Sequence, residues 1–352
     1  MNICLRGLLL IAWVAWGTAQ ANDCPTPDAL RDAHVPGVVI ATFDGQQTRF
    51  STCGLADTAH QRPMSKRTVF QAASLSKPVF ALITLKLVQQ GRLDLDRPLV
   101  SYLHGPYRHD QNPMGAQPVW DTVSDPRLAK VTARMVLSHR SGWPNWAFGE
   151  PLQFAADPGE RWKYSGEGLA YLATVLQTIT GQPLQQLANE QVFKPFGMRD
   201  SSYVWRDAYD GRIATGYDAE GKALGVVRFR RPLAAASLYT TPADYAKFVR
   251  ALLRAAPGTP LALERERQTE VDAKYALDWG LGVGLETQAD ASCAFHHGVN
   301  NGFQSFFMVC PASGRGVLWF TNSDRGLSLA PALLEAHVPG AHPVLEWPML
   351  HP

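Results

Sequence analysis

The sequence has few cysteines and almost no excess of charge of either sign. Its five cysteines in 352 residues are too few for a small scaffold held together by disulfides. Lysine plus arginine (33) nearly balances aspartate plus glutamate (31), whereas a nucleic-acid-binding surface needs a concentrated basic patch. Hydrophobic residues make up 46% of the chain, which disfavours disordered, collagen-like and coiled-coil structures. We therefore expect a globular protein that has no nucleic-acid partner.

Long apolar runs are also absent, except near the start of the chain. The first 21 residues combine a positive residue, an apolar run ending at Trp16 and an A-x-A site ending at Ala21, which is typical of a secretory signal peptide. The run is too short to span a bilayer, and the residues before Cys24 do not resemble a lipobox. We expect cleavage between Ala21 and Asn22, and a soluble periplasmic or secreted protein without a membrane anchor. The alternative is an ordinary buried N-terminal helix.

Cleavage there would remove one cysteine and leave four, an even number that favours disulfides in an exported protein. The midpoint between Cys293 and Cys310 falls at Asn301-Gly302, a strong hairpin-turn dipeptide. Strands that turn there would place these two cysteines opposite each other. We therefore predict a Cys293–Cys310 disulfide, which leaves Cys24 and Cys53 to tie the N-terminus to an early strand. The alternative is four buried free thiols.

Strand-like segments lie near the two ends of the chain and helical segments in the middle. Turn residues and β-branched runs predict strands at 37–43, 48–53, 281–285, 294–299, 303–309 and 316–321. Apolar periodicity predicts helices at 74–91, 169–180, 242–255 and 330–337. We expect one α/β (α+β) domain over residues 22–352, with an antiparallel sheet from both chain ends (about 22–90 and 271–352) flanked by helices. An all-helical lobe (about 91–270) would be inserted between the two parts of the sheet.

Several familiar catalytic and binding motifs are missing or incomplete. The segment 216–223 resembles a phosphate-binding loop, but it ends in Ala223, which has no hydroxyl for magnesium. No H-E-x-x-H zinc motif occurs, and the side chains of the adjacent His296 and His297 would diverge on a strand. The G-x-S-x-G elbow of α/β-hydrolases is absent as well. The sequence therefore predicts no metal site.

Ser74-Leu-Ser-Lys77 is the only S-x-x-K in the chain. It opens a predicted helix, where residues three apart share one face, so the Ser74 hydroxyl would lie near the Lys77 amine. The backbone N–H of Ser74 would be free to bind an oxyanion at the helix N-terminus. Serine needs a neighbouring base to become nucleophilic, and lysine can be that base only where its site favours the neutral amine. The pattern predicts an acyl-transfer nucleophile.

Two other short segments would complete such a site. Tyr164-Ser165-Gly166 precedes a predicted helix and places a tyrosine at the edge of a loop. His296-His297-Gly298 falls on a predicted strand, where the glycine would let a substrate lie close to the backbone. Together with the S-x-x-K segment they supply a nucleophile, possible bases and a surface for the substrate.

These motifs resemble those of the serine β-lactamase and penicillin-binding superfamily, in its branch of class C β-lactamases, D-peptidases and family VIII carboxylesterases. The resemblance covers nearly the whole chain after residue 21. Matching segments occur in the order and spacing of the family at residues 70–77, 136–142, 158–168, 193–198, 236–242, 279–282 and 302–305. Several separate motifs in order are far more specific than one S-x-x-K.

The resemblance implies a β-lactamase-like fold and a serine hydrolase that forms an acyl-enzyme at Ser74. Lys77 and Tyr164 would share the work of general base and proton shuttle, with the division between them left open. Backbone N–H groups of Ser74 and Val299 would form the oxyanion hole. Water would then hydrolyse the acyl-enzyme, and the resemblance implies no metal or organic cofactor.

Two departures from the family pattern concern substrate binding. His296-His297-Gly298 stands where the family usually has Lys-Thr-Gly or Lys-Ser-Gly, whose lysine offers positive charge to a substrate carboxylate. A histidine is mostly neutral near pH 7. The second motif commonly ends in asparagine, and Gly166 cannot supply its amide contact to the substrate.

We therefore expect a small-molecule acyl substrate, an ester or a small amide. One alternative is a class C-like β-lactamase, D,D-carboxypeptidase or D-aminopeptidase. The other is a non-catalytic penicillin-binding-like sensor, which retention of Ser74, Lys77 and Tyr164 disfavours. The sequence carries no signal for an oligomeric state or for the native substrate.

Three tryptophans, Trp143, Trp146 and Trp205, fall in the predicted helical lobe. Loops of that lobe would set the width of a substrate pocket. Aromatic residues in such a position pack more often than they line a pocket. We therefore expect the three side chains to be packing residues, with pocket lining as the alternative.

Overall fold

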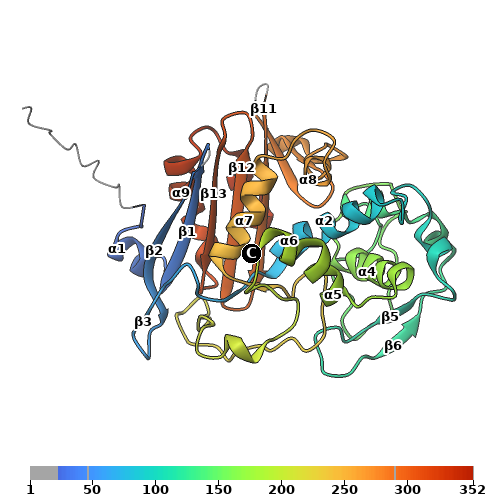
Figure 1. The fold of residues 1–352 in the computed structure, drawn as a ribbon, viewed down its shortest axis with the longest axis horizontal. Coiled ribbons are helices and arrows are strands. Elements are labelled where there is room, and N and C mark those ends of the chain that lie inside the picture. Colours follow the sequence, from blue (N-terminus) through green and yellow to red (C-terminus); the bar gives the residue numbers. More distant parts are fainter. Residues whose placement is uncertain (1–22, 46, 289–290, 352) are drawn as a thin grey trace, which may run out of the picture.

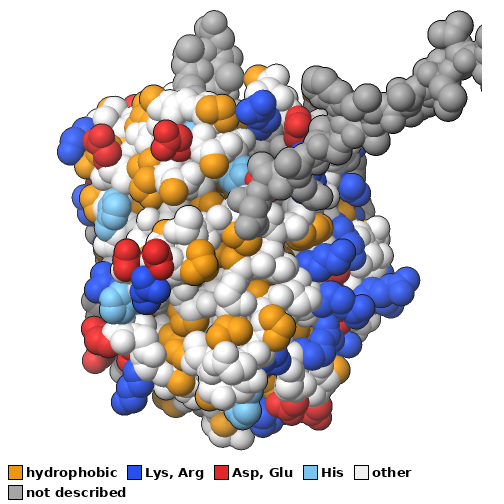
Figure 2. All heavy atoms as spheres, turned by 90° about the vertical axis from the view of Figure 1, so that its left-hand side faces the viewer, with side chains coloured by type: hydrophobic (Ala, Val, Ile, Leu, Met, Phe, Trp, Pro, Cys, Tyr) orange, Lys and Arg blue, Asp and Glu red, His pale blue; other side chains and the backbone are white. Residues whose placement is uncertain are grey.

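The computed structural model describes residues 23–45, 47–288 and 291–351. The predicted signal peptide and its cleavage site lie outside the described residues. Within the described part of the chain, no helix has the length and apolar character needed to cross a membrane. Figure 2 shows the side of the molecule near β2 and β3, where basic and acidic side chains are both present and hydrophobic side chains occur in small groups.

A nine-stranded sheet runs through one half of the molecule (Figure 1). Its strand order is β3-β2-β1-β13-β12-β11-β10-β9-β8, and neighbouring strands are antiparallel. The strands are β1 (Gly37–Asp44), β2 (Gln47–Asp57), β3 (Arg62–Pro63), β8 (Thr269–Asp272), β9 (Leu277–Trp279), β10 (Gly284–Gln288), β11 (Ala291–Asn300), β12 (Phe303–Cys310) and β13 (Arg315–Thr321). Because β1 pairs with both β2 and β13, the prediction of an antiparallel sheet from both chain ends is confirmed.

Helices cover both faces of this sheet. The helices are α1 (Pro27–Asp32), α2 (Ser76–Gln89), α3 (Ala133–Leu137), α4 (Gly166–Thr180), α5 (Leu184–Ala188), α6 (Lys194–Phe196), α7 (Pro242–Leu253), α8 (Pro260–Glu264) and α9 (Ala330–His337). Alternate residues of β1 belong to different cores: Val39 and Ala41 belong to the core that includes residues of α2 and α7, while Val38 and Ile40 belong to the core that includes residues of α9. This alternation follows from the two-residue period of a strand.

The hairpin between β11 and β12 turns at Asn301-Gly302, as predicted. Gly302 has a φ of 76°, which the tight turn requires and which glycine adopts without strain. The register pairs Ala294 with Val309, and the flanking Cys293 and Cys310 form a disulfide. The structure also contains the second predicted disulfide, between Cys24 and Cys53.

Several predicted elements begin or end a few residues from where they were expected. The helix expected from Ser74 starts with a 3-10 turn, η1 (Ala73–Leu75), before α2. The strand expected at 281–285 begins only at Gly284, because Gly282 has a φ of 107°, which is not a strand conformation. The Gly282 backbone lies against α2, where a Cβ would come within 2.4 Å of the Cβ of Ala81. The helix expected to end at residue 255 stops at Leu253.

The segment 91–270 was expected to be all helical, and this is wrong in part. It contains the hairpin of β5 (Arg108–Asp110) and β6 (Trp120–Thr122), and also β7 (Tyr239–Thr240), which pairs with β4 (Phe70–Gln71). A polar contact joins the two strands of the β5–β6 hairpin: the Nδ1 atom of the buried His109 lies 2.7 Å from an Asp121 carboxylate oxygen. That contact joins residues whose spacing gives no periodic signal.

Candidate active site

Ser74 and Lys77 meet at the start of α2, as the helical spacing predicts. The Lys77 amine donates a hydrogen bond to Ser74 Oγ at 2.8 Å and another to the carbonyl oxygen of Ala235 at 2.9 Å. Lys77 is almost completely buried. Two acceptors on different segments therefore hold the amine beside the hydroxyl that it would deprotonate.

Burial sets the charge of Lys77. Desolvation lowers the pKa of its amine from 10.5 to about 7, because a charged ammonium loses its hydration in an apolar interior. Among the ion pairs of the described residues, none involves Lys77. A lysine with this pKa has a substantial neutral fraction near pH 7, so it can accept the proton of the serine.

Tyr164 lies directly against this pair. The Lys77 amine is 4.6 Å from the centre of the Tyr164 ring. Burial raises the pKa of the phenol, and the nearby Ser74 hydroxyl lowers it only in part. The phenol is therefore protonated near neutral pH. Within the described residues its buried oxygen has no hydrogen bond of ordinary geometry, which leaves its O–H available to a substrate.

His139 positions the loop that carries Tyr164, a role that our sequence analysis did not identify. Its ring centre lies 4.4 Å from that of Tyr164, and its Nδ1 accepts the backbone N–H of Ser165 at 3.1 Å. Burial and then the charge of Lys77 lower the pKa of this imidazole well below its usual value. His139 also has a φ of 55°, which sequence periodicity cannot reveal.

The two histidines of the third motif lie on the part of β11 that β10 does not cover. Their side chains leave the strand on opposite faces, as expected, since His296 pairs with Phe307 of one core and His297 with Phe306 of the other. Their ring centres are nevertheless only 5.9 Å apart and lie 6.2 and 6.4 Å from that of Tyr164. Tyr164 lies beside the strand edge, where side chains from both faces can reach it. Among the described residues, no cluster of His, Cys, Asp and Glu could hold a metal ion.

Both histidines are buried and neutral near pH 7. Burial and then the charge of Lys77 lower the pKa of His297 to about 4. Burial, followed by His297 and Lys77, lowers the pKa of His296 well below 6.5. The Nδ1–H of His296 donates to the carbonyl oxygen of His297 at 2.7 Å. The third motif therefore offers a substrate no fixed positive charge.

The register of β11 orients the backbone of Val299. Asn300 pairs with Phe303 across the two-residue turn and Val299 pairs with Gln304. Hydrogen-bonded and non-hydrogen-bonded pairs alternate along an antiparallel ladder, and the pair next to a two-residue turn is hydrogen-bonded. The N–H of Val299 therefore points away from β12, toward the uncovered strand edge. This orientation suits the predicted oxyanion role.

Gly298 lies against the backbone that carries the nucleophile. A Cβ at this position would lie 2.4 Å from the carbonyl oxygen of Ala72, 2.7 Å from Ser305 Oγ and 3.3 Å from the Cβ of Ala73. We expected the glycine to make room for a substrate. The structure shows that the space is occupied by residues of the chain itself, so Gly298 sets how closely β11 approaches η1.

Replacing Gly298 with alanine is expected to cost about 1–3 kcal/mol of stability, as overpacked substitutions do, and to lower the reactivity of the Ser74 hydroxyl at least about tenfold, since small displacements of reacting groups have large effects. The new Cβ would push β11 away from the segment before Ser74. Thermal unfolding and the rate at which a fluorophosphonate probe labels Ser74 would be measured together. Gly105→Ala is the control, because a Cβ there meets nothing within 4 Å. Wild-type stability and labelling rate in Gly298→Ala would contradict this account.

Gly166 begins α4 and offers no side chain to a substrate, as expected. A Cβ there would meet the Trp146 ring at 2.7 Å and the Asn145 carbonyl oxygen at 2.8 Å. Its N–H donates to both the backbone oxygen and Oδ1 of Asn145, at 3.0 Å each. The exposed Asn145 therefore holds its side chain at the second motif, which sequence reasoning missed because Asn145 is 21 residues earlier in the chain.

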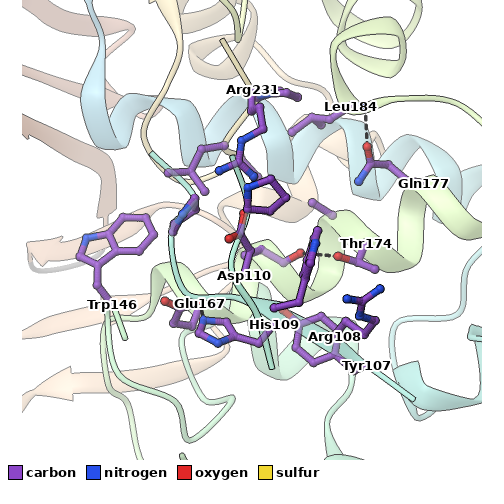
Figure 3. Close-up of a pocket in the computed structure, with 18 residues that line it drawn as sticks. Tyr107, Arg108, His109, Asp110, Trp146, Glu167, Thr174, Gln177, Leu184 and Arg231 are labelled. Carbon is purple, nitrogen blue, oxygen red and sulfur yellow. Dashed lines mark hydrogen bonds and ion pairs between the residues drawn. The ribbon is translucent and has the colours of Figure 1, made fainter. Parts of the chain in front are cut away.

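All three tryptophans pack as expected, and one of them also lines a cavity. Trp143 and Trp205 are buried in hydrophobic cores. Trp146 is only partly buried and lines a cavity beside the site (Figure 3). Trp146 therefore packs as expected, against the core and over Gly166, and the pocket-lining alternative applies to it as well.

Comparisons with known proteins agree with this geometry. A family model described as Beta-lactamase matches residues 24–338. The esterase EstB of Burkholderia gladioli is 31% identical over 218 residues, which are 53% of this chain and 52% of EstB. The D-alanyl-D-alanine-carboxypeptidase/endopeptidase AmpH of Escherichia coli K12 is 25% identical over 232 residues, 62% of this chain and 57% of AmpH. The matches thus span little more than half of these two relatives.

A solved structure shows the same fold. The beta-lactamase/D-alanine carboxypeptidase from Pseudomonas syringae superposes with a TM-score of 0.71 at 17% sequence identity. The superposition covers 88% of this chain and 96% of that protein. At this identity the likeness concerns the arrangement of helices and strands.

Proposed function

The chain belongs to the beta-lactamase family, and on that premise we propose that it is a serine hydrolase that cleaves esters or small amides through an acyl-enzyme at Ser74. The observation that carries the preference for these substrates is the uncharged third motif. His296 and His297 are neutral near pH 7 because they are buried beside Lys77. A site without fixed charge favours substrates that lack a carboxylate.

In the proposed reaction, neutral Lys77 takes the proton of Ser74 Oγ as this oxygen attacks the substrate carbonyl. The backbone N–H groups of Ser74 and Val299 stabilise the oxyanion. The protonated Tyr164 supplies a proton to the leaving group as the acyl-enzyme forms. A water molecule then attacks the acyl-enzyme, and the same groups act in reverse order to release the acid.

The neutral third motif disfavours a β-lactamase or a D,D-carboxypeptidase, because both act on substrates with a carboxylate. The intact contact between Lys77 and Ser74 at 2.8 Å disfavours a non-catalytic sensor. The relatives include both an esterase and a D-alanyl-D-alanine carboxypeptidase by name. The choice among these reactions therefore rests on the charge of the site.

A substrate panel tests this proposal. p-Nitrophenyl acetate and butyrate, a D-amino acid amide and nitrocefin would be assayed with the wild-type protein. We expect kcat/KM for the best ester to exceed that for nitrocefin at least about tenfold, because the missing cation is worth at least about 1.4 kcal/mol of discrimination. Nitrocefin turnover as efficient as ester turnover would overturn the preference for esters.

We also propose that the protein is exported after cleavage at Ala21. Two disulfides, Cys24–Cys53 and Cys293–Cys310, suit an oxidising compartment. The intact mass of protein recovered from the periplasm or the medium tests this proposal. A mass that begins at Asn22 is expected, and an uncleaved chain would contradict it.

A further inference from the structure

The C-terminal segment, residues 339–351, folds back onto the protein after α9 has ended at His337. It begins where the match to the family model stops, at residue 338. Two short 3-10 turns, η8 (Pro343–Glu346) and η9 (Pro348–Leu350), make up most of it. The segment therefore lies outside the part of the chain that the family model matches.

Buried side chains recur every three residues along this segment. Val344, Trp347 and Leu350 are buried and belong to the core that includes residues of α9. A 3-10 helix has three residues per turn, so residues three apart lie on the same side of a turn. A proline opens each of the two turns, where its missing N–H is not needed. The pattern of the segment thus directs one apolar edge into the protein.

A buried polar contact fixes the start of the segment on β10. The Nδ1 atom of His342 lies 2.8 Å from one Glu286 oxygen, and the other Glu286 oxygen accepts the N–H of Val344 at 3.1 Å. Nε2 of the same ring contacts the carbonyl oxygen of Val338. Because both ring nitrogens face acceptors, the geometry fits the charged imidazolium, in which both donate. Breaking a buried pair of this kind is costly, so it holds the segment in place.

Trp347 extends from this segment to the third motif. Its ring centre lies 5.8 Å from that of His297, and the two rings meet edge to face, which is a favourable arrangement for aromatic side chains. His297 is only 5% exposed and Trp347 only 4%. The tryptophan is therefore one of the groups that keep the His297 ring from solvent.

The same tryptophan contacts the loop that carries Tyr164. The ring centre of Trp162 in that loop lies 5.9 Å from that of Trp347 and 6.2 Å from that of Tyr164. Tyr164 in turn stacks on His297 at 6.4 Å. These four rings form a closed circuit in which each contacts two others. Trp347 thus lies where the loop of the second motif meets the strand of the third.

The groups around His297 leave it without a charged partner of opposite sign. Lys77 of α2 opposes its protonation, and its neighbours His296 on β11 and Tyr164 on the loop are uncharged near pH 7. On the C-terminal segment, Glu346 precedes Trp347 but is exposed. Burial is the largest cause of the depressed pKa of His297, ahead of the Lys77 charge. The neutrality of this ring therefore depends first on what covers it.

We propose that Trp347 is a specificity-determining residue, which covers His297 and holds the loop of Tyr164 against β11, and so keeps the site selective for acyl substrates without a carboxylate. This inference rests on the proposed function, because the selectivity is that of acyl transfer at Ser74. It assigns the uncharged third motif to a contact made by a segment outside the motif.

A titration of His297 tests the cover. The pKa would be measured by NMR on protein with labelled histidines, and the signal assigned from its absence in His297→Gln. In Trp347→Ala the pKa is expected to rise from about 4 to above about 5, because water then reaches the ring. Trp347→Phe should keep the wild-type value, since a phenyl ring still covers the histidine. This readout does not depend on activity.

Two matched esters test the selectivity. The p-nitrophenyl esters of hexanoate and adipate have acyl chains of equal length, and only adipate ends in a carboxylate. The ratio of kcat/KM for the adipate ester to that for the hexanoate ester would be followed from pH 7.5 to about 5.5. It should stay flat in the wild type and rise at least about threefold in Trp347→Ala as His297 gains charge, the scale of a partly solvated ion pair. Protonation of Lys77 affects both esters equally and cancels in the ratio.

Trp205→Ala is the control, because Trp205 is buried in a different core. It should lower stability and change neither the His297 pKa nor the ratio. Trp347→Leu keeps an apolar residue in the core, so it replaces Trp347→Ala if that variant does not fold, with changes in the same direction.

An unchanged pKa of His297, or a raised pKa with an unchanged ratio, would overturn the inference. Equal changes in Trp205→Ala would also overturn it, because the effect would then be unspecific. Absence of any ester hydrolysis that depends on Ser74 is a different result, and it would overturn the proposed function together with the selectivity inferred from it.

Discussion

Replacing Ser74 with alanine is expected to lower kcat/KM for the best ester at least about 10⁴-fold, the scale of loss when a catalytic nucleophile is removed. Without Oγ no acyl-enzyme forms, and the amine of Lys77 loses the group that it would deprotonate at 2.8 Å. Ester hydrolysis and thermal unfolding would be measured on the same preparations. Ser101→Ala, at an exposed position, is the control and should keep wild-type activity.

Covalent labelling checks the same prediction without turnover. A fluorophosphonate probe should add its mass to the wild-type protein, and digestion should locate the adduct at Ser74. The alanine variant should not be labelled. Equal labelling of both proteins, or a loss of activity below about tenfold, would exclude Ser74 as the nucleophile.

Replacing Lys77 with methionine is expected to lower kcat/KM about 10²- to 10⁴-fold, the usual contribution of a general base. The methionine fills a similar volume but cannot accept a proton. The variant should also unfold at a higher temperature at pH 7, because a buried amine whose pKa is depressed to about 7 destabilises the folded state wherever the unfolded lysine is charged. A loss of activity with a loss of stability would point to a structural role instead.

The pH dependence of both kcat/KM and stability follows from the Lys77 amine. Below about pH 7 Lys77 is protonated in the folded protein and cannot act as a base, so kcat/KM should rise with pH through about 7 and then level off. Stability should rise with pH between about 7 and 10.5, since the unfolded chain binds the extra proton in this window. Below pH 7 both states hold the proton and this slope disappears. A wild-type profile without the limb near pH 7 would contradict the role of Lys77.

Local patterns predicted much of the fold and the central pair of the site. The three-residue spacing of Ser74 and Lys77 fixes their contact because η1 leads directly into α2, so the two residues lie one helical turn apart. Asn301-Gly302 fixes the β11–β12 hairpin and with it the opposition of Cys293 and Cys310. These features depend on residues that are close in the sequence or joined by one turn.

Other parts of the site depend on contacts between distant segments, which no local pattern records. Gly298 meets Ala72 from a strand more than 200 positions away, so its real neighbour could not be read from its own motif. His139 requires a left-handed backbone conformation that an ordinary histidine rarely adopts. The depressed pKa of Lys77 depends on complete burial, which only the assembled structure creates.

The position of β1 in the sheet has a consequence for how the chain acquires its structure. β1 pairs with β2, which follows it directly, and with β13, whose residues lie about 280 positions later. The β1–β2 hairpin and the β11–β12–β13 strands can each form from local contacts. The sheet cannot close until β13 has been synthesised and can pair with β1. Such distant pairings slow folding, because the loop must be closed before its contacts are gained. Closure of the sheet therefore awaits the synthesis of β13.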